Sequence, residues 1–285
     1  MKVKEITGLF SEELKEIYAD REIKNLAFFV LEEVLGYSRA EVIINHEKEI
    51  DKEKLTSIIN ALGKLKQEIP IQYIFGKAEF YGLPFIVNSD VLIPRPETEE
   101  LVEWIIKDNI NSAAKILDIG TGSGCIAIAL KKNIPGSSVF AVDISEDALN
   151  VARENALINN VQINFSIVDI LNYQSSLVFP EVDIIISNPP YIRSSEKVLM
   201  KNIVVQNEPQ IALFVQDDDP LVFYKSITSF AMTHLIPDGN IYFEINENLS
   251  SELVNMIESE GDFKTILRED LNGKKRMIKC SFKSH

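Results

Sequence analysis

The sequence predicts an α/β protein in which a small helical bundle precedes a parallel sheet covered by helices. Apolar residues recur at helical spacing from 11 to 65, residues 71–93 are strand-like, and from 115 onward short apolar runs alternate with helical stretches. Such alternation requires a parallel sheet with helices on both faces. We therefore expect a helical domain at 1–69, a β-hairpin linker at 70–94 and an α/β domain at 95–285.

The first part has the spacing and the end signals of packed helices. An amphipathic stripe over 14–35 stops at Gly36, a residue that suits a helix C-terminus. Ser38 and Asp51 precede further helical runs, where their side-chain oxygens can accept hydrogen bonds from the first free amides of a helix. Pro70 then breaks the helical pattern.

Beyond Pro70, strand patterns dominate. Aromatic and β-branched residues among glycines and prolines predict a hairpin within 71–93, and a second hairpin is expected over 263–282 around Asn272-Gly273. The expected strands of the parallel sheet are Lys115–Ile119, Ser138–Asp143, Ile163–Asp169, Val182–Ser187 and Gly239–Ile245. The helices expected around them are near 99–107, 124–132, 145–159, 220–235 and 248–260.

Charge and composition narrow the possible partners. The chain has 29 Lys and Arg against 43 Asp and Glu, a net charge of −14, so its field repels nucleic-acid backbones. We therefore expect a protein or small-molecule partner and no direct nucleic-acid contact. No apolar run reaches the roughly 18 residues that spanning a bilayer takes, which predicts no membrane segment.

The cysteines and histidines predict neither a disulfide nor a metal site. Cys125 and Cys280 form no CxxC motif, which favours a reducing, cytoplasmic environment. The three histidines are scattered along the chain, so we expect no bound metal. Asp217-Asp-Asp219 is interpreted as a solvated acidic turn, and Trp104 as a packing residue.

A glycine-rich loop joins the first strand of the α/β domain to its helix. In Asp118-Ile-Gly-Thr-Gly-Ser-Gly124 three glycines let a ligand approach bare backbone. A dinucleotide fingerprint counted from Gly120 needs a glycine at its sixth position, where Cys125 stands, so the spacing argues against NAD. Asp118 at the strand end suits the ammonium of a methionine moiety, which favours a sulfonium cofactor.

Two further aspartates end the next strands. Asp143 can accept hydrogen bonds from ribose hydroxyls, and Asp169 can reach an adenine amino group. The alternative is that both merely cap the helices that follow.

The fourth strand ends in Asn188-Pro189-Pro190-Tyr191, a loop rich in hydrogen-bond acceptors. Two prolines fix φ and remove two amide donors, which leaves rigid carbonyls beside an Asn and an aromatic ring. A planar NH₂ group of adenine, cytosine or glutamine fits, with Asn188 and the Pro189 carbonyl accepting its hydrogens and Tyr191 stacking on its plane. A rigid turn is the alternative, but the shared sheet edge with the glycine loop favours a ligand site.

Together these motifs resemble the HemK/PrmC family of peptide chain release factor N(5)-glutamine methyltransferases. The resemblance rests on the glycine loop, on Asn188-Pro-Pro-Tyr-Ile192 and on the segments 70–74, 80–83 and 91–99, and it spans about residues 70 to 279. It implies a class I (Rossmann-like) S-adenosylmethionine-dependent methyltransferase domain with an N-terminal helical bundle. It also implies S-adenosylmethionine as methyl donor, S-adenosylhomocysteine as product and the glutamine of the release factor Gly-Gly-Gln loop as acceptor.

The resemblance also implies roles for residues of this chain. The acceptor glutamine would be held by Asn188, Pro189, Pro190 and Tyr191. The cofactor would be bound by Asp118, Gly120, Thr121, Gly122, Ser123, Gly124, Asp143, Asp169, Ile170 and Asn188. Arg95, Glu97 and Thr98 lie in a family signature near the cofactor pocket, and a hinge salt bridge between Arg95 and Glu97 is the alternative. Residues 1–69 would help to dock the release factor.

Two segments depart from the family pattern. Residues 214–221 stand where the family has a Gly-Gly pair followed by Asp-Gly-Leu, and Asn246 replaces a glycine in Phe243-Glu-Ile-Asn246. Both changes concern loop geometry near the acceptor and leave the reaction class unaffected.

Three other functions remain open at this point. An adenine amino methyltransferase acting on DNA or RNA would share the Asn-Pro-Pro-Tyr loop, but it calls for a basic groove, which the charge argues against. A non-catalytic S-adenosylmethionine-binding protein would not need the intact Asn188 and Tyr191. An NAD oxidoreductase conflicts with Cys125 in the glycine loop. We therefore expect a cytoplasmic, monomeric enzyme that methylates release factors.

Overall fold

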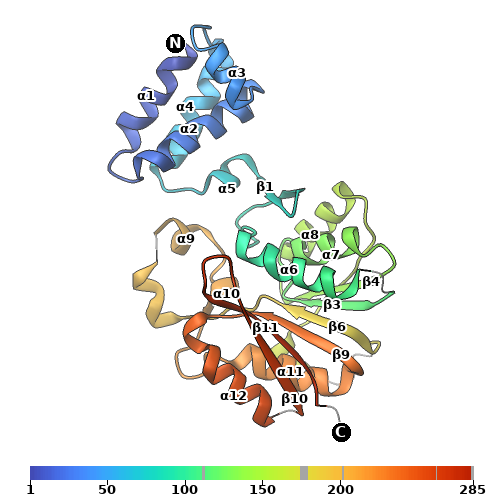
Figure 1. Ribbon diagram of the computed structural model, residues 1–285. Coiled ribbons are helices and arrows are strands. Elements are labelled where there is room, and N and C mark those ends of the chain that lie inside the picture. The colour runs from blue at the N-terminus through green and yellow to red at the C-terminus, as the bar shows by residue number, and fades with distance from the viewer. Residues whose placement is uncertain (111–112, 174–178, 201, 261, 284–285) are drawn as a thin grey trace. The chain divides into compact units, whose positions relative to one another are not determined.

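The computed structural model describes residues 1–110, 113–173, 179–200, 202–260 and 262–283. The chain divides into two compact units (Figure 1). The first unit contains Met1–Gly76 and helix α9 (Asn202–Asn207), and the second runs over Lys77–Met200 and from Glu208 onward. The predicted division into a docking domain at 1–69, a linker at 70–94 and a methyltransferase domain at 95–285 stays a prediction.

The first unit is a helical bundle, as its apolar spacing predicts. Its other helices are α1 (Val3–Leu14), α2 (Asp20–Leu35), α3 (Arg39–Ile44), α4 (Lys52–Lys66) and α5 (Ile71–Phe75). Their apolar faces bury one common core that includes Ile6, Phe10, Ala27 and Ile58. The predicted end signals are confirmed, because Gly36 has a left-handed φ of 71° and the Ser38 and Asp51 side chains accept helix-start amides. The stripe expected over 14–35 is interrupted, since α1 ends at Leu14 and α2 starts at Asp20.

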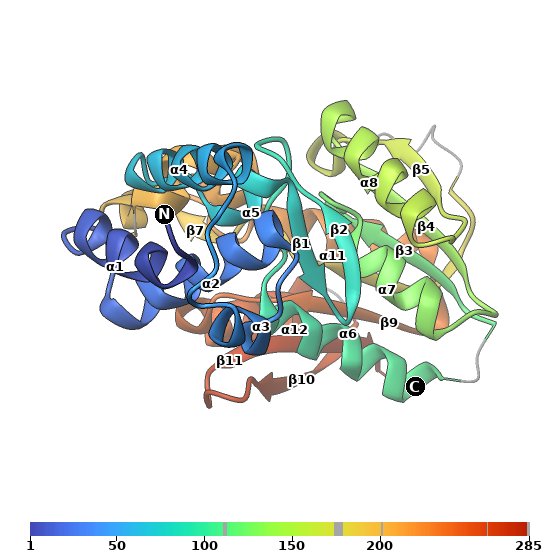
Figure 2. The same cartoon turned by 90° about the horizontal axis from the view of Figure 1, so that it is seen from above.

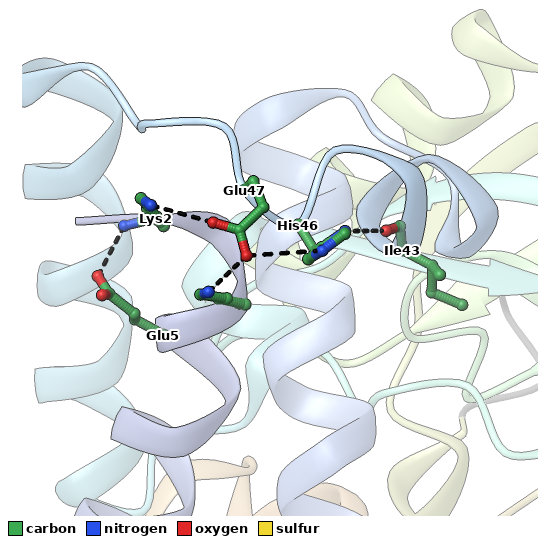
Figure 3. A network of polar contacts seen from close by, with 6 residues as sticks. Lys2, Glu5, Ile43, His46 and Glu47 are labelled. Atoms are coloured by element: carbon green, nitrogen blue, oxygen red, sulfur yellow. Dashed lines mark hydrogen bonds and ion pairs between the residues drawn. The ribbon is translucent and has the colours of Figure 1, made fainter.

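The start of the bundle is fastened to the loop before α4. The Val3 amide donates to the Lys48 carbonyl at 3.1 Å. The Glu47 carboxylate accepts hydrogen bonds from the Lys2 and Lys4 ammonium groups, and His46 Nε2 lies 3.6 Å from it (Figure 3). Hydrogen bonds from the two lysines lower the pKa of Glu47 to about 2. The network is exposed, so salt screens it.

The stretch that follows Pro70 differs in part from the predicted hairpin. Residues 71–75 form the short helix α5 rather than a strand, because Pro70 precedes its first turn and Gly76 ends it with a left-handed φ of 66°. The hairpin itself is confirmed further on. Strands β1 (Lys77–Phe80) and β2 (Leu83–Ile86) pair antiparallel around Tyr81 and Gly82, and both of these residues have positive φ.

The second unit is built on one seven-stranded sheet with the order β10-β11-β9-β6-β3-β4-β5. Its strands are β3 (Lys115–Ile119), β4 (Ser138–Asp143), β5 (Asn164–Ile167), β6 (Val182–Ser187), β9 (Leu235–Glu244), β10 (Phe263–Glu269) and β11 (Lys275–Phe282). The neighbouring strands β5, β4, β3, β6 and β9 run parallel to one another. Strand β11 runs antiparallel to both of its neighbours, β9 and β10. The predicted strands are confirmed within a few residues. The exception is β9, which begins at Leu235 because that residue pairs with Val182 across an irregularity in the register.

Helices cover both faces of this sheet, as predicted. Helices α6 (Pro96–Asn109), α7 (Cys125–Asn133) and α8 (Glu146–Ile158) lie on one face, and α11 (Val222–His234) and α12 (Ser250–Glu260) lie on the other (Figures 1 and 2). Alternate strand residues serve the two faces, so Tyr242 joins the first core and Phe243 the second. Trp104 is buried and packs edge-on against Tyr242 with ring centroids 5.6 Å apart, which confirms its packing role.

Short elements complete the unit. They are η1 (Ile170–Asn172), β7 (Ile192–Arg193), η2 (Ser194–Leu199), α10 (Gln210–Leu213), β8 (Phe214–Val215) and η3 (Glu247–Leu249). None of the helices in the described ranges has both the length and the apolar character needed to cross a bilayer.

Candidate active site

The strand register brings three loops to one edge of the sheet. Ile119 of β3 pairs with Ser187 of β6, which pairs in turn with Phe243 of β9. The next residue on each strand, namely Gly120, Asn188 and Glu244, therefore lies at the same carboxyl edge. The strand order reverses at β3. Strands β4 and β5 lie on one side of β3, whereas β6 and β9 lie on its other side. Open α/β sheets bind ligands at such a switch point.

A cavity of about 260 Å³ opens at this edge. It brings together most of the residues singled out in the sequence: Arg95, Thr98, Gly120, Thr121, Gly122, Ser123, Asp143, Asp169, Ile170, Asn188, Pro189 and Pro190. Asp118, Gly124, Glu97 and Tyr191 are not among the residues that line it. Apolar walls come from Val91, which lies in the 91–99 segment, and from residues to which the sequence analysis gave no role, among them Ile211, Phe223 and Ile227.

The glycine loop presents bare backbone to the cavity. Gly120 and Gly122 have φ values of 75° and 53°, and a Cβ built on either meets no atom within 4 Å. The left-handed φ favours glycine at both positions, and the open space leaves the backbone accessible to a ligand. Gly124 also has a left-handed φ, of 79°, but it lies against α8, where a Cβ would be 3.1 Å from Ala152 Cβ.

Asp118 supports the loop from beneath. It is fully buried, and its Oδ2 accepts a hydrogen bond from Thr121 Oγ1 at 2.6 Å. Its other carboxylate oxygen has no hydrogen-bond partner among the described residues. Burial raises the pKa of Asp118 to about 7.

The other two strand-end aspartates face the cavity. The Gly122 amide donates to Asp143 Oδ2 at 2.8 Å and the Ser145 amide donates to its Oδ1 at 3.0 Å, so this carboxylate holds the glycine loop to β4. Burial raises the pKa of Asp143. Asp169 also caps η1 by accepting from the Leu171 amide at 2.9 Å, so the cap and the place in the cavity lining occur together, and the predicted contact with adenine stays a prediction.

A chain of side-chain hydrogen bonds supports the Asn-Pro-Pro-Tyr loop. Asn188 Nδ2 donates to Thr98 Oγ1 at 3.3 Å, and Thr98 Oγ1 donates to Glu244 Oε2 at 2.6 Å. The Tyr191 hydroxyl donates to Glu244 Oε1 at 3.1 Å. Both ends of the four-residue motif are thus tied to one glutamate on β9. The predicted stacking of Tyr191 on an acceptor stays a prediction.

Arg95 lines the cavity and pairs with a buried glutamate. Its Nη2 donates to Glu208 Oε1 at 2.6 Å, and the Ile93 amide donates to Glu208 Oε2 at 3.3 Å. Glu97 lies in the first turn of α6, where its charge raises the pKa of Glu244 in addition to the larger effect of burial. The Glu208 carboxylate therefore holds both the Arg95 side chain and the backbone at Ile93, although Glu208 lies 113 residues from Arg95 in the sequence.

Sequence reasoning missed three polar residues of this region. Glu208 and Glu244 are almost completely buried, and Asn155 of α8 is fully buried beside the glycine loop. Glu244 had a usable signal, because it ends an apolar strand at the same edge as Asp118 and Asp143. Glu208 and Asn155 have no local signal, since their partners lie far away in the sequence.

The atypical segments fit the loop geometry without strain. Asn246 has a φ of −75°, so this position does not require glycine, and its Nδ2 donates to the Tyr191 carbonyl at 3.4 Å. Phe214 begins β8, which pairs with β7 directly after the Asn-Pro-Pro-Tyr loop. Asp217 accepts from Ser195 rather than facing a metal site. Within the described ranges no three His, Cys, Asp or Glu side chains are grouped to hold a metal ion, and His285 lies outside those ranges.

Comparisons of the sequence show that the protein with this fold and cavity is a methyltransferase. A family described as "Methyltransferase small domain" matches residues 97–213, and one described as "PrmC N-terminal domain" matches residues 7–76. A release factor glutamine methyltransferase of Flavobacterium psychrophilum is 45% identical, covering 99% of this chain and 100% of its own. Another, of Bacteroides thetaiotaomicron, is 40% identical over 96% of this chain and 98% of its own. The chain belongs to the release factor glutamine methyltransferase family, which confirms the resemblance found in the motifs.

Solved structures agree at the level of the fold. A methyltransferase from Pyrococcus furiosus has a TM-score of 0.52 at 18% identity, covering 82% of this chain and 100% of its own. The hMettl16 catalytic domain has a TM-score of 0.55 at 18% identity, covering 82% of this chain and 83% of its own. At these identities the likeness shows the Rossmann-like fold alone, and it confirms the predicted fold class.

Proposed function

We propose that this protein transfers the methyl group of S-adenosylmethionine to the side-chain amide nitrogen of the glutamine in the Gly-Gly-Gln loop of peptide chain release factors. The observation that carries the proposal is the placement of the glycine loop and the Asn-Pro-Pro-Tyr loop on adjacent strands around one cavity. The family relationship supports the choice of acceptor.

The residues on the β3 and β4 side of the cavity fit S-adenosylmethionine. The open space over Gly120 and Gly122 admits a ligand to bare backbone. Each oxygen of Asp143 accepts one backbone amide and has a second lone pair, so this carboxylate can also receive ribose hydroxyls. Asp169 and Ile170 would flank the adenine, and Asp118 would hold the loop in shape from beneath through its hydrogen bond with Thr121. When bound, the cofactor supplies an electrophilic methyl group on its sulfonium.

The residues on the β6 side fit a primary carboxamide. Because Asn188 Nδ2 is engaged by Thr98, Asn188 Oδ1 is available to accept one hydrogen of the acceptor NH₂ group. The Pro189 carbonyl accepts the other. These bonds hold the acceptor nitrogen and stabilise the positive charge that develops on it, and Pro189 and Pro190 have no amide donor that could compete. Such a site needs no strong general base.

Charge and the N-terminal unit bear on the identity of the acceptor. The net charge of −14 favours a protein over a nucleic acid as the acceptor macromolecule.

We assign residues 1–69 to docking of the release factor. We also propose that the protein is a monomer located in the cytoplasm. Deletion of residues 1–69 is expected to weaken methylation of an intact release factor, and unchanged methylation would contradict the docking role. Light scattering checks the oligomeric state.

Methyl transfer from labelled S-adenosylmethionine tests the proposal directly. The purified protein is incubated with an intact release factor, with the same factor carrying alanine in place of the loop glutamine, and with DNA and RNA. We expect label on the intact factor alone. Label on nucleic acid would overturn the acceptor, and absence of label despite bound cofactor would overturn the activity.

A further inference from the structure

We propose that Glu244 is a positioning residue that determines which way the Asn188 carboxamide faces, acting through the Thr98 hydroxyl. The inference rests on the proposed function and deepens it at the acceptor loop. Glu244 ends β9 with 2% exposure and stands behind the cavity lining, so it acts without touching the acceptor.

The direction of each hydrogen bond carries the argument. A hydroxyl has one hydrogen to donate, and the hydrogen of Thr98 is committed to Glu244 Oε2 at 2.6 Å. Toward Asn188, Thr98 Oγ1 can therefore only accept, and the carboxamide meets it with Nδ2 at 3.3 Å. This choice leaves Asn188 Oδ1 for the acceptor.

The opposite orientation would disable the loop. If the Thr98 hydrogen were free, it could donate to Asn188 Oδ1, and the carboxamide would then present its own NH₂ group to the acceptor NH₂ group. Two donors facing each other form no hydrogen bond. An acceptor-only carboxylate at position 244 prevents this by holding the Thr98 hydrogen.

The same carboxylate also fixes the far end of the motif. Glu244 Oε1 accepts from the Tyr191 hydroxyl at 3.1 Å, so one side chain anchors a loop in which two prolines lack amide donors. Burial raises the pKa of Glu244, which means that keeping a carboxylate here costs stability. Buried titratable groups of this kind cluster at functional sites.

Four variants test the inference, with methyl transfer to a release factor as the readout. Glu244→Gln keeps the shape but leaves a single acceptor oxygen, so the side chain can no longer accept from both Thr98 and Tyr191, and Thr98→Val removes the hydroxyl. We expect each to lower kcat by about 10- to 100-fold, with the dissociation constant of S-adenosylmethionine changed by less than about twofold. Thr98→Ser keeps the hydroxyl and should restore most of the rate that Thr98→Val loses. Because Glu244 acts through Thr98, the double variant Glu244→Gln/Thr98→Val should be no slower than the slower single variant.

Tyr224→Phe is the matched control for a merely structural effect. The Tyr224 hydroxyl donates to the Glu244 backbone carbonyl at 2.9 Å, so this variant also removes a buried hydrogen bond at position 244 but leaves the carboxylate chain intact. We expect its kcat to stay within about twofold of wild type.

The possible outcomes separate the two proposals. A wild-type protein that leaves the release factor unlabelled would overturn the proposed function and this inference with it. If wild type transfers the methyl group but Glu244→Gln is equally fast, the positioning role alone is wrong. Additive losses in the double variant, or a loss in Tyr224→Phe as large as that in Glu244→Gln, would also overturn it.

Discussion

The two sides of the cavity achieve their geometry by different means. On the β3 and β4 side, one short loop presents its backbone, and its shape follows from glycines with left-handed φ and from Asp143 of the next strand. On the β6 side, Asn188 depends on Thr98, 90 residues away, and Thr98 depends on Glu244, 146 residues away. The first side is therefore determined largely by local sequence, whereas the second exists only after the domain has folded.

On the β3 and β4 side of the cavity, the variant expected to have the largest effect is Gly122→Ala. A Cβ at this position would enter the open space above the loop, and a left-handed φ costs a non-glycine residue about 1–2 kcal/mol. We expect the affinity for S-adenosylmethionine to fall by about tenfold or more, measured by calorimetric titration.

Gly273→Ala is the matched control, because Gly273 also has a left-handed φ and also has open space around its Cβ position, but lies in the turn of the C-terminal hairpin. Both variants should lose similar stability in urea. Equal cofactor affinities for the two would contradict the role assigned to the loop.

Asn155→Ala tests whether the glycine loop also depends on a contact with a residue that is distant in the sequence. Asn155 Oδ1 accepts from the Ile86 amide at 2.6 Å, and its Nδ2 donates to the Ile86 and Ser123 carbonyls at 2.9 Å. Each buried group left without a partner costs about 1–3 kcal/mol, so we expect a loss of about 2–5 kcal/mol in the free energy of unfolding, measured in urea.

Asn133→Ala provides the comparison for Asn155. Asn133 Nδ2 donates to a single carbonyl, that of Ala129, within its own helix. We expect this variant to lose less than about 1 kcal/mol. Losses of the same size in both variants would show that Asn155 has no special part in joining the hairpin and the glycine loop to α8.

Asp118→Asn tests the buried carboxylate beneath the loop by its pH dependence. The pKa of Asp118 is raised by burial from its ordinary value of 3.8 to about 7. A raised carboxyl pKa means that the folded state binds the proton more tightly, so stability is lost as the pH rises from about 4 through about 7. The carboxamide of the variant has no proton to lose in this range, so the variant should lack this part of the pH dependence. Parallel stability curves for the two proteins between about pH 4 and 8 would contradict the raised pKa.

The same contrast separates the features that the sequence predicts from those that it does not. Residues with a local signal could be predicted, such as the buried strand Val182–Ser187, the cap at Asp51 and the glycine loop. Residues 71–75 were predicted wrongly, because a short helix and a strand cannot be told apart by aromatic and β-branched content alone. Glu208 and Asn155 were missed because only tertiary contacts give them partners, and no periodicity encodes such contacts.

The most direct test of the account is the single-turnover rate of Asn188→Ala with saturating S-adenosylmethionine and release factor. The variant removes the carbonyl proposed to hold the acceptor amide and leaves the glycine loop intact. With both substrates saturating, we expect a transfer rate lower by about 100-fold or more. Transfer at the wild-type rate would contradict the claim that Asn188 holds the acceptor glutamine.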